Sequence, residues 1–262
     1  MNLQGKVILV TAATRGIGFS CVSRCAREGA CVYLAARNPD KAQAQVQQLN
    51  GYDVHWVYCD ATKPDTIASM IDTVMAKSGA IHGLVNNFGT SDPRRDLDFS
   101  HTDAAYFLDL VMVNLRSVFL TSQLAARCMA DGSGGSIVNI SSVGGTIADL
   151  SQVAYGTSKA AINHLTRLIA VHEARNGIRC NAILPGMTAT DAVVQHLTPD
   201  FRSRFLRHIP LGRMGKPEEI AAATAFLLSD DAAYMTGQTL SISGGFGLAS
   251  PLYGDTPQDN RA

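Results

Sequence analysis

The sequence has no excess of charge of either sign. Lysine and arginine total 22, aspartate and glutamate also total 22, and the isoelectric point is near 7.0. A protein whose main partner is nucleic acid or an anionic membrane usually presents a concentration of basic residues. The balanced composition therefore gives no electrostatic reason to expect nucleic acid or a membrane as a partner.

Long apolar runs are also missing. No stretch approaches the ~18 consecutive apolar residues of a membrane-spanning helix. The chain start leads directly into the apolar run Val7–Val10, without the longer apolar segment and small-residue cleavage site of a signal peptide. These absences favour a cytoplasmic protein.

The cysteines do not fall in the paired spacings of a zinc site, which normally needs four ligands. Cys21 and Cys25 lie four residues apart in a helical pattern, and no second pair faces them. Free cysteine is among the most frequently buried residue types. We therefore expect no bound metal and reduced, buried thiols at the cysteine positions, which are 21, 25, 31, 59, 128 and 180.

What the 262-residue sequence does contain is a regular alternation of short apolar runs and longer amphipathic stretches. Buried β-branched strands that alternate with helices indicate a parallel sheet with helices on both faces. The predicted fold class is α/β, a single-domain, Rossmann-like, doubly wound parallel sheet of about seven strands. The predicted strands are Val7–Val10, Cys31–Ala35, Val54–Cys59, a short strand ending at Leu84-Val85, Ile137–Ile140, Arg179–Leu184 and Thr239–Ile242; the predicted helices cover Gly16–Glu28, Pro39–Leu49, Pro64–Lys77 and the regions near 103–130, 153–175 and 217–229.

A glycine-containing turn, Thr11–Gly18, follows the first predicted strand. Ligands of open α/β sheets bind beyond the carboxyl ends of the strands, and a turn leading into a helix offers free N–H groups to a pyrophosphate. Gly16 and Gly18 allow close approach of the backbone. The turn alone is also compatible with an ordinary strand-to-helix connection, because Ala12 occupies the first glycine position of the dinucleotide-binding pattern.

The end of the second strand bears on the choice of cofactor. A site that prefers NAD usually has an acidic residue here for the ribose hydroxyls, and Ala36 has no carboxylate. Arg37 follows, and Arg15 lies in the glycine turn. Two guanidinium groups suit the 2′-phosphate of NADP. The alternative is that Arg37 is a solvated loop residue.

Tyr155 and Lys159 lie four residues apart, on one face of a predicted helix. A free tyrosine has a pKa near ~10 and is a poor base at neutral pH, but a neighbouring ammonium stabilises the phenolate. Such a pair can exchange a proton with an alcohol or carbonyl while hydride moves to or from a nicotinamide. The spacing alone is common by chance, so its context matters. Polar residues fall at other strand ends and in one helix, namely Ser142, Asn86–Gly89, Asn114 and Pro185–Thr190.

Taken in order, TAATRGIG, NNFG, VNLRSVF, Ser142, YGTSK and PGMTAT resemble the short-chain dehydrogenase/reductase family, from about Lys6 to Gly245. The resemblance implies that Tyr155 is the general acid/base and that Ser142 orients the substrate oxygen. It further implies that Lys159 binds the nicotinamide ribose and lowers the pKa of Tyr155, and that Asn114 holds a water in a proton relay. Asp60 would bind the adenine and Thr190 the nicotinamide carboxamide. The implied cofactor-binding set is Thr14, Arg15, Gly16, Ile17, Gly18, Arg37, Asp60, Ala61, Asn87, Gly89, Tyr155, Lys159, Pro185, Gly186, Thr188 and Thr190.

Two positions depart from the family pattern. Ala12 replaces the usual first glycine, which predicts a slightly wider turn. Phe88 replaces the usual alanine of NNAG, which puts a large ring beside the cofactor cleft.

The segment after Thr190 is expected to form a substrate lid over about 190–210. It is apolar, with Arg202, Arg204, Arg207 and His208 interleaved. Such a lid suits a bulky apolar substrate that bears an acid. The alternative is an amphipathic helix that packs on the core with its arginines in water.

A narrower resemblance concerns the substrate. VTAATRGIG, Phe88, TDAVVQHLTPDF and GGFGLASPLYGD together resemble bacterial 7α-hydroxysteroid dehydrogenases, which implies a bile acid or other steroid as substrate. The 3-oxoacyl-carrier-protein reductases and sugar dehydrogenases share the same reacting residues and remain alternatives. A cofactor-sensing protein that has lost turnover is an alternative of another class.

The same resemblance bears on domains and assembly. We expect one dinucleotide-binding and catalytic domain over residues 1–250 and a polar tail over 251–262, which is either mobile or covers a neighbouring subunit. Apolar residues exceed what one helix face needs near 103–130 and 153–175. Because the family pairs these helices between subunits, we expect a homotetramer with two-fold axes.

Overall fold

The computed structural model describes residues 3–195, 197–250 and 253–254. Its centre is a parallel sheet of seven strands in the order β3-β2-β1-β4-β5-β6-β7. The predicted doubly wound α/β fold is therefore confirmed. The strands are β1 (Val7–Val10), β2 (Cys31–Ala36), β3 (Val54–Tyr58), β4 (Gly83–Asn86), β5 (Gly135–Ile140), β6 (Ile178–Pro185) and β7 (Thr239–Ile242).

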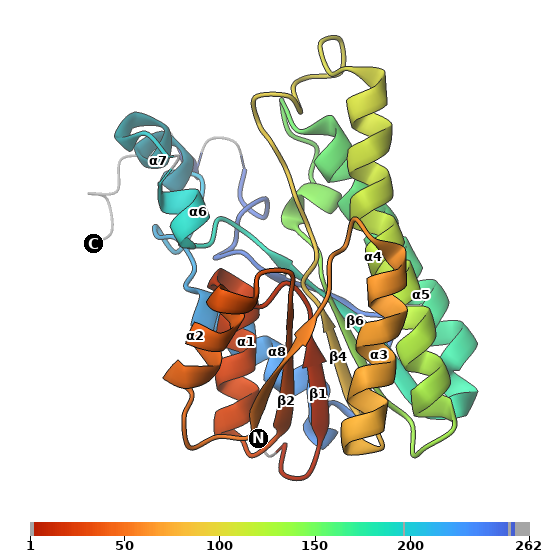
Figure 1. Cartoon of the computed structure of the whole chain (residues 1–262). Coiled ribbons are helices and arrows are strands. Elements are labelled where there is room, and N and C mark those ends of the chain that lie inside the picture. The colour runs from red at the N-terminus through yellow and green to blue at the C-terminus, as the bar shows by residue number, and fades with distance from the viewer. Residues whose placement is uncertain (1–2, 196, 251–252, 255–262) are drawn as a thin grey trace.

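Helices cover both faces of this sheet (Figure 1). The buried residues of α1, α2 and α8 form one apolar cluster with the sheet, and those of α3, α4 and α5 form a second cluster on the opposite face. These helices are α1 (Gly16–Arg27), α2 (Pro39–Gln48), α3 (Pro64–Ser78), α4 (Ala104–Ala130), α5 (Val153–Glu173) and α8 (Pro217–Leu228).

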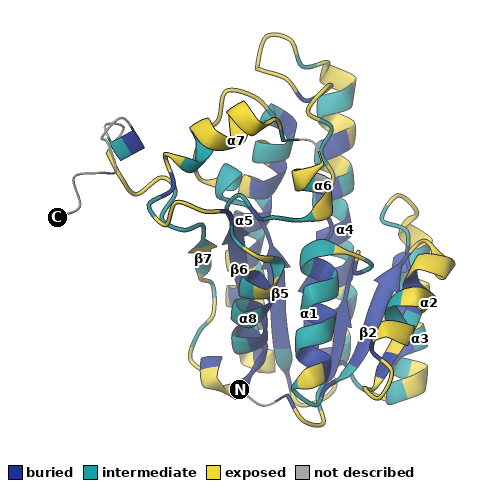
Figure 2. Cartoon of the chain, turned by 90° about the vertical axis from the view of Figure 1, so that its left-hand side faces the viewer, coloured by how far each residue is buried: buried dark blue, intermediate teal, exposed yellow. Residues whose placement is uncertain are grey.

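Two short helices, α6 (Asp191–Val194) and α7 (Pro199–Leu206), occupy the segment expected to form the lid. Figure 2 shows much of the surface of α7 as exposed, in contrast with the buried strands. Short 3-10 turns also occur in the described part of the chain, among them η1 (Val143–Gly145), η2 (Ala174–Asn176) and η3 (Asp230–Ala232). Most of the tail expected at 251–262, together with His196 of the lid, lies outside the described residues.

Helix α4 combines unusual length with an apolar composition. Among the described residues it is the one helix that could cross a membrane by length and composition, with a mean hydropathy of 1.4 in its best window. In this fold α4 packs on the sheet between α3 and α5. Its outward face still carries Leu108, Met112 and Phe119, which are 65%, 55% and 45% exposed. Spacings of four and seven residues place these three side chains on one stripe of the helix.

The described cysteines are free, as expected, and Cys21, Cys25, Cys59 and Cys180 are buried. The expected burial is wrong for Cys31 and Cys128, which are partly exposed. In the described chain, one group of potential metal ligands comes together at the amino ends of β2 and β3: Cys31, Asp53 and His55. Asp53 and His55 already contact each other, with Oδ1 2.7 Å from Nε2. Burial raises the pKa of the Cys31 thiol to about 11, which disfavours the thiolate that a metal requires.

Candidate active site

The strand order reverses between β1 and β4, which are neighbours in the sheet. In doubly wound sheets the ligand crevice lies beyond the carboxyl ends of the strands at this switch point. The loops that follow β1 and β4 are bonded to each other here. Asn87 donates its backbone N–H to Thr11 Oγ1 at 2.9 Å and its side-chain amide to the Ala12 carbonyl at 3.1 Å. The predicted glycine turn therefore has a fixed position at the crevice.

The glycine turn leaves little room for a side chain at either of its two glycine positions. A Cβ atom at Gly18 would lie 2.6 Å from Asn87 Nδ2 and 2.8 Å from the Ala12 carbonyl oxygen. Gly16 has a φ of +54°, and its Cβ would lie 3.0 Å from Thr190 Cγ2. Packing alone therefore requires glycine at Gly18, whereas packing and backbone conformation together favour glycine at Gly16.

The start of α1 fits an anionic ligand. Within the described chain, α1 has neither an acidic residue in its first turn nor a side-chain hydrogen bond from its N-cap residue, Arg15. The first N–H groups of a helix have no partner inside the helix and attract negative charge. Arg15 is itself exposed and adds a positive charge. The turn can therefore hold the pyrophosphate of a dinucleotide.

Ala12 has a φ of +51°, in the left-handed region that favours glycine. The alanine therefore carries backbone strain of roughly 1–2 kcal/mol. The slightly wider turn expected from Ala12 stays a prediction.

Arg37 follows β2 and Asp60 follows β3, and the two side chains lie close enough for the charge of Arg37 to act on the Asp60 carboxyl group. Ala36 is buried, and Arg37 is exposed. Burial alone would raise the pKa of Asp60, but hydrogen bonds from Thr62 and the charges of Arg37 and Lys63 together lower it. This end of the crevice can thus offer a guanidinium to a phosphate and a carboxylate to an adenine.

Lys159 is buried and held by backbone carbonyl groups. Its Nζ donates to Ile140 O at 2.9 Å and to Phe88 O at 3.4 Å. Burial lowers the pKa of Lys159 to about 8. The ammonium is therefore still mostly protonated at neutral pH, and a small change in its surroundings can release its proton.

Tyr155 lies on the same helix, with the Lys159 Nζ 5.6 Å from the centre of its ring. Burial raises the pKa of Tyr155, and a hydrogen bond with Ser142 opposes this rise. Ser142 lies two residues after the end of β5, where its Oγ also accepts from the Gly144 N–H at 3.1 Å. The structure thus brings the three predicted residues together. The lowering of the pKa of Tyr155 by Lys159 stays a prediction for the enzyme with its cofactor.

Asn114 lies behind these residues, on α4, and is 1% exposed. Its amide group donates to Thr90 O and to Ser158 Oγ, each at 3.1 Å, and its Oδ1 accepts from Thr90 N at 2.9 Å. Asn114 therefore connects α4 to the β4 loop and to α5. Its expected role in holding a water stays a prediction.

A cleft of about 1220 Å³ opens over this centre. Ten of the predicted residues line it, namely Ile17, Asn87, Gly89, Ser142, Tyr155, Lys159, Pro185, Gly186, Thr188 and Thr190. Thr190 also caps α6, where its Oγ1 accepts from Val193 N at 3.3 Å. Since a Cβ atom at Gly16 would meet the methyl group of Thr190, the start of the lid segment lies next to the glycine turn. The remaining predicted residues lie outside the lining of this cleft: Thr14, Arg15, Gly16, Gly18, Arg37, Asp60, Ala61 and Asn114.

Aromatic side chains form the wall of the cleft on the lid side. Phe205 packs against Phe201 and Phe246, with ring centres 5.9 and 5.0 Å apart, and all three rings line the cleft. The lid arginines at 202, 204 and 207 are exposed and, in the described chain, are not part of that lining. The segment therefore presents its apolar side to the cleft and its cations to water. Phe88 is 5% exposed and belongs to the apolar core under α3 and α4, and it also lines the cleft, as its position in NNFG predicted.

Sequence reasoning missed several residues around the cleft. Phe99, Phe107, Gln152 and Phe246 line it. Phe246 entered the sequence analysis only as part of GGFGLASPLYGD, without a predicted role in the cleft. Asp96 was also missed, although it contacts the start of α5. Its partners are 58 and 59 residues away along the chain. No local spacing could have revealed that contact.

Comparison with known proteins gives consistent matches over the whole chain. A family model described as enoyl-(acyl-carrier-protein) reductase matches residues 11–247. The chain is 42% identical over 256 residues to a 7α-hydroxysteroid dehydrogenase of Clostridium sardiniense, covering 97% of this chain and 98% of the relative. It is 44% identical over 257 residues to the 7α-hydroxysteroid dehydrogenase of Paraclostridium sordellii, covering 97% and 96%.

Two further matches bear on the alternatives. The chain is 36% identical over 245 residues to the 3-oxoacyl-[acyl-carrier-protein] reductase FabG of Escherichia coli, covering 94% of this chain and 98% of the relative. A solved structure of a 7α-hydroxysteroid dehydrogenase in complex with NADH and 7-oxo glycochenodeoxycholic acid superposes with a TM-score of 0.88. It is 34% identical, and the match covers 94% of this chain and 95% of that one.

Proposed function

This chain belongs to the short-chain dehydrogenase/reductase family and is an oxidoreductase, and we propose that it interconverts the 7α-hydroxyl group and the 7-ketone of bile acids with NADP(H). The observation that carries the proposal is the position of Ser142, Tyr155 and Lys159 together in a cleft that has an aromatic wall. Its support from outside the chain is the high identity to 7α-hydroxysteroid dehydrogenases over nearly the whole length.

The reacting residues divide the work of proton transfer. When bound, the nicotinamide supplies the acceptor or donor of hydride. Ser142 Oγ holds the substrate oxygen next to the Tyr155 hydroxyl, and Tyr155 takes the proton during oxidation or returns it during reduction. Since burial raises the pKa of Tyr155, the protein by itself favours the protonated tyrosine that ketone reduction needs. Lys159, held on Ile140 O, provides the positive charge that favours the phenolate for the reverse direction.

The cofactor preference rests on charge at the end of β2. Ala36 offers no carboxylate to a ribose hydroxyl, and Arg37 is exposed beside Asp60. Arg37 and Arg15 are suited to pair with a 2′-phosphate. We therefore propose NADP as the preferred cofactor. The solved relative holds NADH, so direct competition between the two cofactors is the appropriate test.

The substrate class follows from the shape and polarity of the cleft. Phe201, Phe205 and Phe246 present a rigid apolar surface of the kind that buries a ring system. The proposed substrate class does not depend on the exposed arginines of α7. It rests on the apolar wall of the cleft and on the substrates named for the relatives.

Nicotinamide absorbance measured with a panel of substrates tests the function. The panel contains cholanoates hydroxylated at position 3, 7 or 12 and a 3-oxoacyl thioester, each with NADP(H) and with NAD(H). Oxidation of the 7α-hydroxylated compounds is the expected result. Reduction of the thioester without any action on cholanoates would instead assign the activity named for the FabG relative. Cofactor binding without turnover would indicate a sensor.

We also propose a homotetramer in the cytoplasm. The exposed stripe of Leu108, Met112 and Phe119 on α4 lies beside α5, which exposes Leu168 and Val171. Single exposed apolar residues are common, but several of them on two helices that pack side by side favour a buried interface. Sedimentation equilibrium at micromolar concentration is expected to give four times the monomer mass. A monomeric mass would rule the assembly out.

A further inference from the structure

Helix α5, which carries Tyr155, begins without a cap of its own. Its N-cap residue, Gln152, makes no capping hydrogen bond with its side chain, and the first turn contains no acidic residue. Gln152 also has φ +63° and ψ +45°, a left-handed conformation that is unfavourable for a residue with a side chain. Something outside the helix must therefore satisfy its first N–H groups and hold this start in place.

Asp96 supplies that partner from the loop between β4 and α4. Its Oδ1 accepts from Ala154 N and its Oδ2 accepts from Tyr155 N, both at 2.9 Å. The residue is 0% exposed. Both carboxylate oxygens thus bond to the first turn of α5, and the negative charge lies at the positive end of the helix dipole.

Backbone contacts fix the loop around this carboxylate. Gln152 N donates to Asp96 O at 3.1 Å, and Asp96 N donates to Asp92 O at 2.8 Å. On the cleft side, Ser91 Oγ donates to Gln152 Oε1 at 2.8 Å. These bonds join the loop and the helix start on both sides of Asp96.

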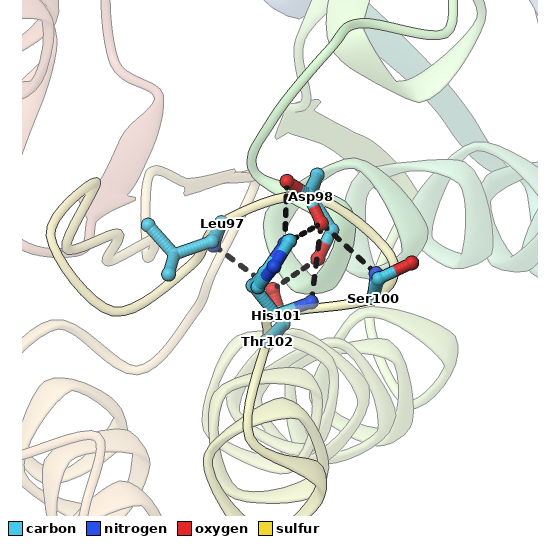
Figure 3. Close-up of polar contacts among 5 residues, drawn as sticks. All are labelled: Leu97, Asp98, Ser100, His101 and Thr102. Atoms are coloured by element: carbon cyan, nitrogen blue, oxygen red, sulfur yellow. Dashed lines mark hydrogen bonds and ion pairs between the residues drawn. The ribbon is translucent and has the colours of Figure 1, made fainter.

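The next turn of the loop is held by its own polar contacts (Figure 3). The Asp98 carboxylate accepts from Ser100 N at 2.9 Å and His101 N at 3.1 Å, and it contacts His101 Nδ1 at 2.8 Å. Thr102 Oγ1 donates to Asp98 O and accepts from Leu97 N, each at 2.9 Å. Hydrogen bonds within the loop therefore hold the residues that follow Asp96, and these bonds use no group of α5.

We propose that Asp96 is a positioning residue for Tyr155. It does not line the cleft in the described chain, so it acts through the backbone of α5 and not on the substrate. Its carboxylate fixes the N–H of Tyr155 itself, and thereby the distance of the phenol from Ser142. The inference rests on the proposed role of Tyr155. Errors of about 1 Å in the placement of a reacting group can cost ~10²-fold in rate.

The nature of the side chain matters as well as its position. A carboxylate presents two acceptors to two N–H groups. The amide of an asparagine presents one acceptor and one NH₂ group, which would face a backbone donor. We therefore expect a graded series in which Asp96→Asn is less damaging than Asp96→Ala.

The experiment compares Asp96→Ala and Asp96→Asn with Asp103→Ala. Asp103 belongs to the same loop and caps α4 by accepting from Tyr106 N at 2.8 Å, so its loss removes a comparable cap elsewhere. Peptide-level hydrogen exchange should show lost protection over 152–158 in the Asp96 variants and over 104–107 in the control. The kcat of Asp96→Ala should fall ~10²-fold, with KM and cofactor dissociation constant little changed, and Asp103→Ala should keep its kcat.

Two outcomes would overturn the inference. One is a folded Asp96→Ala protein with normal kcat. The other is an equal loss of kcat in Asp103→Ala, which would mean that general destabilisation is responsible. If Asp96→Ala fails to fold, the milder Asp96→Asn carries the same comparison. Turnover by Tyr155→Phe would instead contradict the proposed function, while the exchange data on α5 would still report whether Asp96 holds the helix.

Discussion

The two ends of the cofactor crevice are built differently. At the reacting end, Lys159 is buried, and contacts from distant parts of the chain fix Asn114 and the start of α5. At the adenosine end, Arg15 and Arg37 are exposed, and Asp60 takes its hydrogen bonds from Thr62 two residues away. The first end depends on the whole fold, whereas the second is largely encoded by local sequence.

This difference has consequences for energy as well as for recognition. Charges at the exposed end are screened by water, so a substitution there should change binding without affecting the fold. At the buried end, polar groups are desolvated, and a substitution should change the chemistry or the pH dependence of stability. Four substitutions test this contrast.

The largest effect is expected for Tyr155→Phe at the reacting end. The change removes the proton acceptor and keeps the ring, so the variant should fold and bind NADP normally. General acid–base catalysis contributes ~10²–10⁴-fold, and kcat should fall by at least that factor. The measurement is steady-state turnover, with cofactor titration by fluorescence as the control. Full activity of the variant would show that Tyr155 does not transfer the proton, and would contradict the assignment of the chemistry to this end of the crevice.

The next effect is expected at the exposed end, for Arg37→Ala. Loss of a charge-assisted hydrogen bond costs on the order of 1.5–3 kcal/mol, which is ~10–100-fold in affinity for NADP. Affinity for NAD should change little, which makes NAD the internal control. Equal weakening of both cofactors would mean that Arg37 does not bind the 2′-phosphate, and equal use of both by the unmodified protein would refute the NADP preference.

A third effect concerns the pH dependence of stability. Burial lowers the pKa of Lys159 from 10.5 to about 8. Between these values the unfolded chain binds more protons than the folded one, so folding becomes more favourable as the pH rises. Compared with Lys159→Met, the unmodified protein should gain about 2 kcal/mol in free energy of unfolding between pH 8 and pH 10. Urea titrations at each pH give this difference, and parallel curves for the two proteins would contradict the burial argument.

The smallest effect is expected for Ala12→Gly in the glycine turn. Relief of left-handed strain of roughly 1–2 kcal/mol exceeds the entropy that glycine adds to the unfolded chain, about 0.4–1 kcal/mol. The melting temperature should rise by about 1–3 °C. Ala13→Gly is the matched control, since Ala13 is buried and is not among the residues with positive φ. Calorimetry should show it losing stability, and a loss in both variants would mean that Ala12 is not strained.

The fold was predictable because its signals are local. Apolar runs such as Val7–Val10 identify strands by composition, and the alternation with helices dictates a parallel sheet. The glycine turn was also predictable, because its residues are eight consecutive positions after the first strand, Thr11–Gly18. The side chains of Asn87 and Thr190, which help to exclude a Cβ from Gly18 and Gly16, were not predictable from this segment. The backbone strain at Ala12 was not predictable, because the left-handed φ of this residue appears only in the structure.

Long-range contacts limited the prediction of the site. The helical spacing of Tyr155 and Lys159 identified this pair from the sequence. The hydrogen bonds of Asp96 with α5 and of Asn114 with Thr90 could not be predicted, because they join segments that are distant in the sequence and meet only in the folded chain. The arginines of α7 show a related limit. Their presence among apolar residues suggested a lid for an apolar substrate that bears an acid, but in the structure Phe201 and Phe205 line the cleft and the arginines do not.

Oxidation of a 7α-hydroxyl group is best tested by selectivity between the two C7 epimers of one bile acid, because both epimers would give the same 7-ketone. The purified protein is incubated with NADP and either chenodeoxycholate or its 7β epimer, and the products are identified by carbon NMR. We expect a 7-ketone from the 7α compound, none from the epimer, and none from either with Tyr155→Phe. Oxidation at another ring position, or no ketone from the 7α compound, would contradict it.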